Sequence, residues 1–262
     1  MLFTILGKYL LKGIRYFMLS IVSTTAFGVS DFKKINLNNY EIIVGRTSDG
    51  FQGYFLISHD SRIIYEEREF GSYYYIKNRD VNGDGKSDLL LTQWTGGAHC
   101  CYNLAIFDFQ NGLKKLVTIE GGSRGFEFKN LDNDKFLEVI FWDNPIDYLF
   151  SSFTSSAQGR VVLKLKNAKY QLASHLMRRS ISFAEIFKKK LKIVKEFKPE
   201  GEVPYSFLSL MMELSYSGHL DFALSLGEEL WPKQRSGFQK FKLDFTRALS
   251  ESVFWRQFYL AI

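Results

Sequence analysis

The feature that most constrains this chain is a short acidic loop, residues 80–88, in which side chains that carry oxygen alternate along the sequence. Ca²⁺ takes about 6–8 oxygen ligands, and alternating side chains of a tight loop can converge on one ion. Gly85, at the sixth position, supplies the left-handed backbone that lets the chain turn back around that ion. The loop therefore predicts a calcium site. Its ligand positions are Asp80, Asn82, Asp84, the Lys86 carbonyl and Asp88.

A second loop, residues 130–138, repeats this pattern fifty positions later, so the chain contains an internal repeat. Its matching ligand positions are Asn130, Asp132, Asp134 and Glu138. Lys135 stands where the first loop has Gly85, and its cation is expected close to the site. Calcium is therefore predicted more strongly for the first loop. The alternative for the second is a polar turn whose side chains bond their own backbone.

The first loop opens like an EF-hand loop, but Leu91 occupies the position of the final glutamate, and apolar runs suited to strands follow both loops. A D-x-[DN]-x-D-G-x-x-D loop between strands resembles the FG-GAP and VCBS repeats of integrin-type propellers and bacterial surface proteins. The resemblance covers about residues 70–142. It implies that each calcium loop joins two consecutive strands.

Short extended runs separated by turn signals occupy residues 39–172 and predict an antiparallel β domain. Asn111-Gly112 is the strongest hairpin turn. Two repeats and about ten strands are fewer than a closed propeller needs, so a partial propeller-like or sandwich-like assembly is expected. The runs are 40–44, 54–58, 63–67, 73–77, 88–93, 102–109, 113–119, 126–129, 137–142 and 160–165.

Apolar residues recur at helical intervals after about residue 177. The predicted helices span 182–194, 205–216, 220–231, 237–249 and 253–259. The fold class is therefore α+β. Its expected parts are a signal peptide at residues 1–28, a β domain at 29–176 and a small helical domain at 177–262.

Residues 1–28 are typical of an export signal, because basic residues precede an apolar stretch that ends in small residues. The apolar stretch, residues 16–25, is shorter than the roughly 20 residues that span a bilayer. An uncleaved anchor is the alternative. A periplasmic or secreted location is predicted.

The charge of the exported chain is modest. Removing residues 1–28 takes Lys+Arg from 34 to 31 and leaves Asp+Glu at 28, so the net charge falls from +6 to +3. This gives no indication of nucleic acid as a partner. The basic stretch 178–198 is predicted to be the solvated face of an amphipathic helix, with contact to an anionic membrane surface or a polyanion as the alternative.

The segment 94–102 concentrates reactive residue types and holds the two cysteines of the chain, Cys100 and Cys101. In an oxidising compartment these neighbours can form a vicinal disulfide. They can also be plain strand cysteines, join His99 in a soft-metal site, or supply the nucleophile of a thiol hydrolase.

The function predicted from these patterns is an exported calcium-binding protein with a binding or scaffolding role toward a protein or glycan ligand. No linear motif for phosphate, dinucleotide or zinc-hydrolase chemistry is found, which favours a protein that is not an enzyme. The alternative is a hydrolase with a cleft near Trp94–Cys101. Tyr73–Tyr75 and Phe141-Trp142 are predicted as core or edge packing, with a sugar-stacking surface as the alternative.

Overall fold

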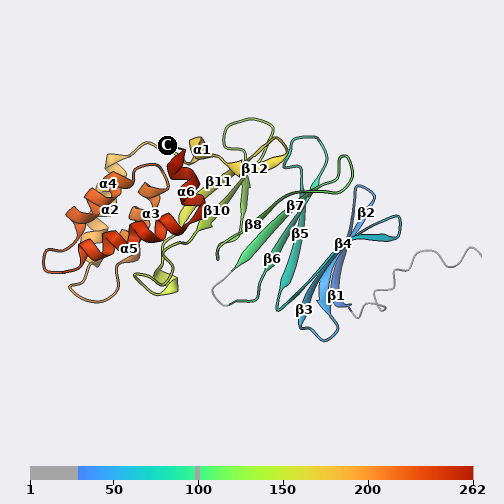
Figure 1. Cartoon of the computed structure of the whole chain (residues 1–262), viewed down its shortest axis with the longest axis horizontal. Coiled ribbons are helices and arrows are strands. Elements are labelled where there is room, and N and C mark those ends of the chain that lie inside the picture. The colour runs from blue at the N-terminus through green and yellow to red at the C-terminus, as the bar shows by residue number, and fades with distance from the viewer. Residues whose placement is uncertain (1–28, 98–100, 262) are drawn as a thin grey trace, which may run out of the picture. The chain divides into compact units, whose positions relative to one another are not determined.

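The computed structural model describes residues 29–97 and 101–261. Within these ranges the chain forms twelve antiparallel strands in three four-stranded sheets, and six α-helices follow them (Figure 1). The α+β prediction is therefore confirmed. The chain divides into two compact units, one up to Tyr75 and the other from Ile76 onward, and each is described by itself.

The first unit is built on the sheet β1-β2-β3-β4. Its strands are β1 (Val29–Leu37), β2 (Tyr40–Thr47), β3 (Gln52–His59) and β4 (Arg62–Phe70). Two-residue turns with positive φ, at 38–39 and 60–61, connect β1 to β2 and β3 to β4. Such turns match the twist of a hairpin. The sequence patterns had missed β1, whose apolar residues do not alternate regularly with polar ones.

The second sheet has the order β5-β6-β7-β8. Its strands are β5 (Tyr73–Arg79), β6 (Asp88–Trp94), β7 (Tyr102–Asp108) and β8 (Lys114–Glu120). The first acidic loop joins β5 to β6. The hairpin predicted at Asn111-Gly112 is confirmed, because β7 and β8 pair in antiparallel register and Gly112 has a φ of 92°.

The third sheet repeats this arrangement in the order β12-β11-β10-β9. Its strands are β9 (Glu127–Lys129), β10 (Glu138–Asp143), β11 (Gly159–Lys166) and β12 (Lys169–Leu172). The second acidic loop joins β9 to β10. Each loop therefore connects the first two strands of a four-stranded meander, as the internal repeat had led us to expect.

The helices are α1 (Ser174–Met177), α2 (Phe183–Glu196), α3 (Tyr205–Ser215), α4 (Leu220–Leu230), α5 (Phe238–Glu251) and α6 (Val253–Leu260), and a 3₁₀ turn, η2, spans Phe153–Ser155. All five predicted helices are present. They share one apolar core with the third sheet, in which Phe207, Phe245 and Phe258 belong to the same buried cluster as Phe141 and Val161. The boundary between the two compact units lies after Tyr75, so the helices belong to the same unit as the strands that precede them. The sequence had suggested a domain boundary at 176/177.

A half-buried carboxylate ties these helices to the third sheet. Asp143, at the end of β10, accepts hydrogen bonds from the Tyr216 hydroxyl and from Ser252 Oγ. Burial raises the pKa of Asp143, and the two hydroxyl bonds offset part of that shift. Ser252 Oγ also accepts the backbone N–H of Trp255 at 3.1 Å and so caps α6. Phe141 is buried in this region, in agreement with its predicted role in core packing.

Candidate metal centre

The two acidic loops share one hydrogen bond, made by the carboxylate at the ninth position. Asp88 and Glu138, at the ninth loop positions, begin β6 and β10 and are 1% and 0% exposed. Asp88 Oδ2 accepts the N–H of Val81 at 2.9 Å, and Glu138 Oε2 accepts the N–H of Leu131 at 2.7 Å. In each copy a buried carboxylate therefore bonds the amide of the second loop position. The repeat is one of structure as well as sequence.

The loops also lie against each other. The N–H of Leu137 donates to the Val81 carbonyl at 3.0 Å. A Cβ added to Gly83 would come within 2.5 Å of the Lys135 carbonyl oxygen, so only glycine fits this contact. The Tyr170 hydroxyl donates to the Leu137 carbonyl at 3.1 Å, and burial, then the charges of Asp88 and Glu138, raise the pKa of this tyrosine. The two acidic loops are thus neighbours in one unit, and among the described residues only the second brings three carboxylates close enough together to hold one metal ion.

The first loop is held in shape by its own side chains. Asp80 accepts the N–H groups of Gly83 at 2.7 Å and Gly85 at 2.9 Å. Asp84 Oδ1 accepts the N–H of Lys86 at 2.7 Å, while Asp84 Oδ2 is buried without a hydrogen-bond partner. A buried carboxylate oxygen without a partner is costly. The loop geometry therefore leaves a strong acceptor unsatisfied at the fifth position.

Negative charge accumulates around this loop. The register that pairs Leu89 with Phe107 puts Asp88 opposite Asp108, one step further along β6 and β7. Burial, followed by the charges of Asp108 and Asp84, raises the pKa of Asp88 to about 6. Across the described ranges, Asp80, Asp84 and Asp88 form no ion pair with a lysine or arginine. No lysine or arginine that the structure describes, Lys86 of the loop included, is therefore paired with the carboxylates of the first loop.

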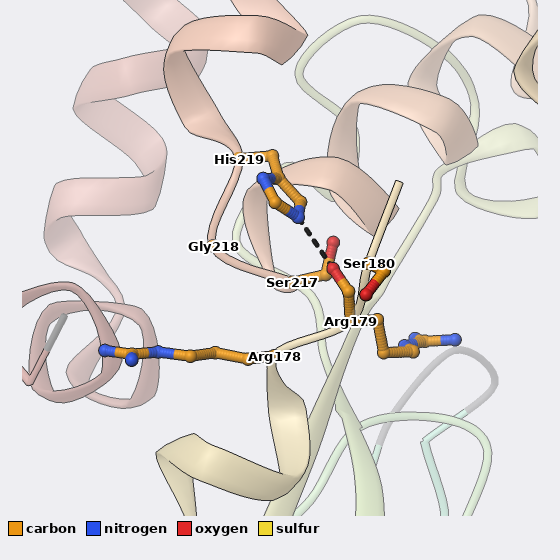
Figure 2. Close-up of a pocket in the computed structure, with 6 residues that line it drawn as sticks. All are labelled: Arg178, Arg179, Ser180, Ser217, Gly218 and His219. Carbon is orange, nitrogen blue, oxygen red and sulfur yellow. Dashed lines mark hydrogen bonds between the residues drawn. The ribbon is translucent and has the colours of Figure 1, made fainter. Parts of the chain in front are cut away.

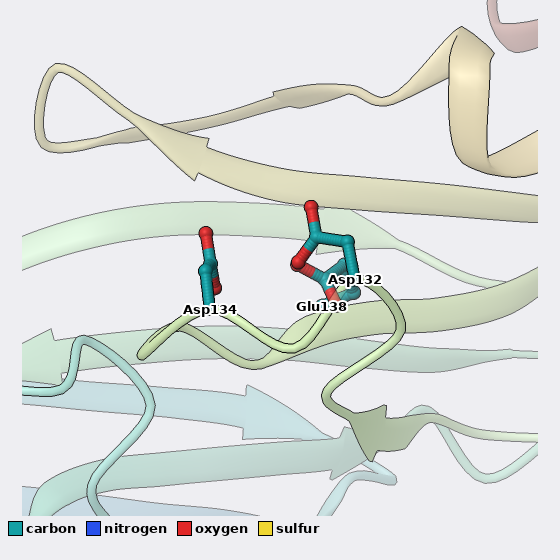
Figure 3. Close-up of side chains that lie close together, drawn as sticks. All are labelled: Asp132, Asp134 and Glu138. Carbon is teal, nitrogen blue, oxygen red and sulfur yellow. The ribbon is translucent and has the colours of Figure 1, made fainter.

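The second loop brings three carboxylates together. One oxygen from each of Asp132, Asp134 and Glu138 lies within 4.8 Å of the others, close enough to hold one metal ion (Figure 3). Lys164, on β11, approaches the same oxygens. Its Nζ donates to Asp132 and, at 2.6 Å, to Asp134, and lies 3.5 Å from Glu138 Oε1. An ammonium group thus lies at the point where the carboxylates converge.

The pKa directions agree with this geometry. Burial alone would lower the pKa of Lys164, but its hydrogen bonds to Asp132 and Asp134 raise it further than burial lowers it. The bond from Lys164 is in turn the largest cause of the lowered pKa of Asp134. Asn130 does not present a free amide, because its Nδ2 donates to the Asp134 carbonyl. The carboxylates of the second loop are therefore neutralised by a lysine of the neighbouring strand β11.

The sequence had placed the Lys135 cation close to this loop, and its charge does contribute, after the bond from Lys164, to the lowered pKa of Asp134. In the structure the Lys135 ammonium lies over the ring of Phe136, 5.1 Å from its centroid, and forms no ion pair with any described residue. The ion pairs come from Lys164, because the register that pairs Val139 with Leu163 puts Lys164 opposite Glu138. Asp108 and Lys164 thus hold equivalent positions in the two copies. Sequence reasoning missed both, since the only signal is their cross-strand register.

The cysteine segment lies between β6 and β7. The Thr95 N–H donates to the Cys101 carbonyl and the Cys101 N–H donates to Thr95 Oγ1, both at 3.1 Å. No cysteine that the structure describes is free, and Cys101 is disulfide-bonded. Cys100 and His99 lie outside the described residues, so the vicinal pairing and the thiol-hydrolase and soft-metal alternatives stay predictions.

A pocket lies elsewhere, between the segment after α1 and the α3–α4 turn (Figure 2). Its polar groups mostly bond the backbone. His219 Nε2 donates to the Arg179 carbonyl at 2.7 Å, and Ser217 Oγ donates to the Glu213 carbonyl at 2.8 Å. The lining residues include two serines and His219 but neither a cysteine nor a carboxylate, so this pocket does not hold the cysteine, histidine and carboxylate of a thiol hydrolase. They are Arg178, Arg179, Ser180, Ser217, Gly218 and His219.

Comparison with known proteins finds a similarity over part of the chain. A probable thylakoid lumen protein from Synechocystis sp. is 35% identical to this chain over 86 residues, which are 31% of this chain and 25% of the relative. The chain therefore spans about a quarter of the length of that relative. No family model matches the chain.

Proposed function

We propose that this protein is an exported calcium-binding protein in which the first loop holds one ion and the second carries its own cation, Lys164. The observation that supports this best is a difference in charge at one cross-strand position. The carboxylate of Asp108 faces the first loop, whereas the ammonium of Lys164 faces the second. A loop rich in carboxylates needs a compensating charge. In the second copy Lys164 supplies it, whereas in the first no residue of the described ranges does.

The chemistry of the first loop favours calcium. Its donors are oxygens of carboxylates, of the Asn82 amide and of the Lys86 carbonyl, and it contains no histidine or cysteine. Oxygen ligands suit hard cations, whereas zinc and copper prefer nitrogen and sulfur. Magnesium requires a near-ideal octahedron and keeps several waters, which a flexible loop of alternating side chains matches less well. The likeness to FG-GAP and VCBS loops supports the same ion.

The role that follows is structural. The first loop contacts the second through Val81 and Leu137, so an ion bound there would stiffen the connection between two repeated sheets. A rigid β scaffold of this kind suits a binding or scaffolding role toward a protein or glycan. Export is supported by the signal-like residues 1–28, which lie outside the described part, and by the relative named as a thylakoid lumen protein.

Elemental analysis and calcium titration of the mature protein test the proposal. We expect one calcium per chain, with magnesium a poor substitute. Asp84→Asn should abolish binding, because it removes the charge of the buried unpartnered oxygen, and the matched variant Asp134→Asn in the second loop should retain one ion. Absence of calcium from the wild-type protein, or loss of the ion only in Asp134→Asn, would contradict the proposal.

A further inference from the structure

Helix α2 has a second apolar face that the core does not cover. Its buried face carries Ile186 and Ile193. A separate stripe of four large apolar side chains follows spacings of four, four and three residues, so these side chains lie on one line of the helix. The stripe is about 16 Å long at 1.5 Å per residue. Its members are Phe183, Phe187, Leu191 and Val194, which are 72%, 61%, 53% and 64% exposed.

The charges beside this stripe have one sign. At 100° per residue, Lys188 and Lys195 flank the stripe on the side away from the core, and neither forms an ion pair with any residue in the described ranges. Glu185 and Glu196 lie on the opposite side of the helix. The exposed face of α2 therefore combines an apolar centre with a basic border.

We propose that this face of α2 binds the surface of an anionic membrane. A row of four exposed apolar side chains is unusual on a soluble protein and marks an interaction site. An amphipathic helix with a lysine-bearing border is suited to the interfacial plane, where apolar side chains enter the acyl boundary and lysines meet lipid phosphates. Contact in this plane requires no spanning segment, and no described helix is long and apolar enough to cross a bilayer.

Vesicle co-sedimentation of the mature protein tests this inference. We expect binding to vesicles of phosphatidylglycerol and phosphatidylcholine to exceed binding to pure phosphatidylcholine by more than about tenfold, and to weaken in high salt. The double variant Phe187→Ser with Leu191→Ser should lose most binding. Phe183 is left unchanged because its ring packs against Phe222. Leu243→Ser, at a 57% exposed position on α5, is the matched control and should bind normally.

A charge variant provides the second arm. Lys188→Glu with Lys195→Glu should reduce binding to the anionic vesicles about tenfold or more, whereas Lys114→Glu with Lys166→Glu changes the net charge equally and should have little effect. Melting temperatures confirm that each variant is folded. Equal binding to neutral and anionic vesicles, or wild-type binding by the stripe variant, would overturn the inference. So would a dimer that the stripe variant dissociates, combined with no vesicle binding, because a second copy would then cover the stripe.

Discussion

Replacement of Lys164 by methionine tests the idea that this side chain substitutes for a metal ion. The change keeps the length and the apolar stem of the side chain but removes the ammonium group that faces three carboxylates. Glu138 is the carboxylate most affected, because it is fully buried and its Oε1 has no hydrogen-bond partner. Lys164→Met therefore leaves a buried carboxylate without its cation.

The magnitude follows from the distance and the burial. At 3.5 Å, the Lys164–Glu138 attraction is about 5 kcal/mol at an effective dielectric constant near 20, before desolvation is counted. Removal of one partner from a buried pair costs about 3–5 kcal/mol. The Lys164 side chain retains 20% exposure, so we expect a loss near the lower limit, about 3 kcal/mol. For a protein of this size that loss lowers Tm by about 6–12 °C.

Urea and thermal unfolding in EDTA measure this loss. Lys166→Met is the matched control, because Lys166 lies on the same strand, carries the same charge and is exposed. That variant should change the free energy of unfolding by less than about 0.5 kcal/mol. Calcium should then restore part of the lost stability of Lys164→Met and raise its stoichiometry from one ion to two. Equal stability of the two variants, with no additional ion bound, would refute the reasoning.

Three further predictions concern the first loop and the cysteines. In the wild type, calcium at a hundredfold excess over Kd should stabilise the fold by about 2.7 kcal/mol. Asp84→Ala should lower this stabilisation much more than Asp134→Ala does. Equal loss of calcium in both variants would contradict the ranking of the loops. The pKa of Asp88 near 6 lies above the unfolded value near 3.9, so the metal-free protein should lose about 2 kcal/mol from this group as pH rises from 4 to 7. Calcium binds the charged form, so its stabilising effect should be larger at pH 7 than at pH 5; melting in EDTA and in calcium at both values measures this, and an equal effect would exclude the assignment. Mass spectrometry after alkylation without reduction should find Cys100 and Cys101 unmodified, because their predicted pairing protects both thiols, whereas two alkylated cysteines would rule out the disulfide.

Much of the local structure could be predicted from the sequence. The loops 80–88 and 130–138, the hairpin at Asn111-Gly112 and the helices after residue 177 were all predicted at or near their observed places. Each depends on residues within one turn, one strand or a few helical turns, so spacing along the chain is sufficient to indicate it. The number and alternation of ligand oxygens in the first loop are properties of the same kind.

Tertiary structure decided which residue faces each loop. Asp108 and Lys164 belong to strands well downstream of the loops they face, and only antiparallel register brings them opposite Asp88 and Glu138. A shift of one residue in either pairing would turn these side chains to the other face of the sheet. The grouping of the helices with the third sheet was likewise settled by packing, because an amphipathic pattern shows that a helix has a buried face but leaves open which surface covers it.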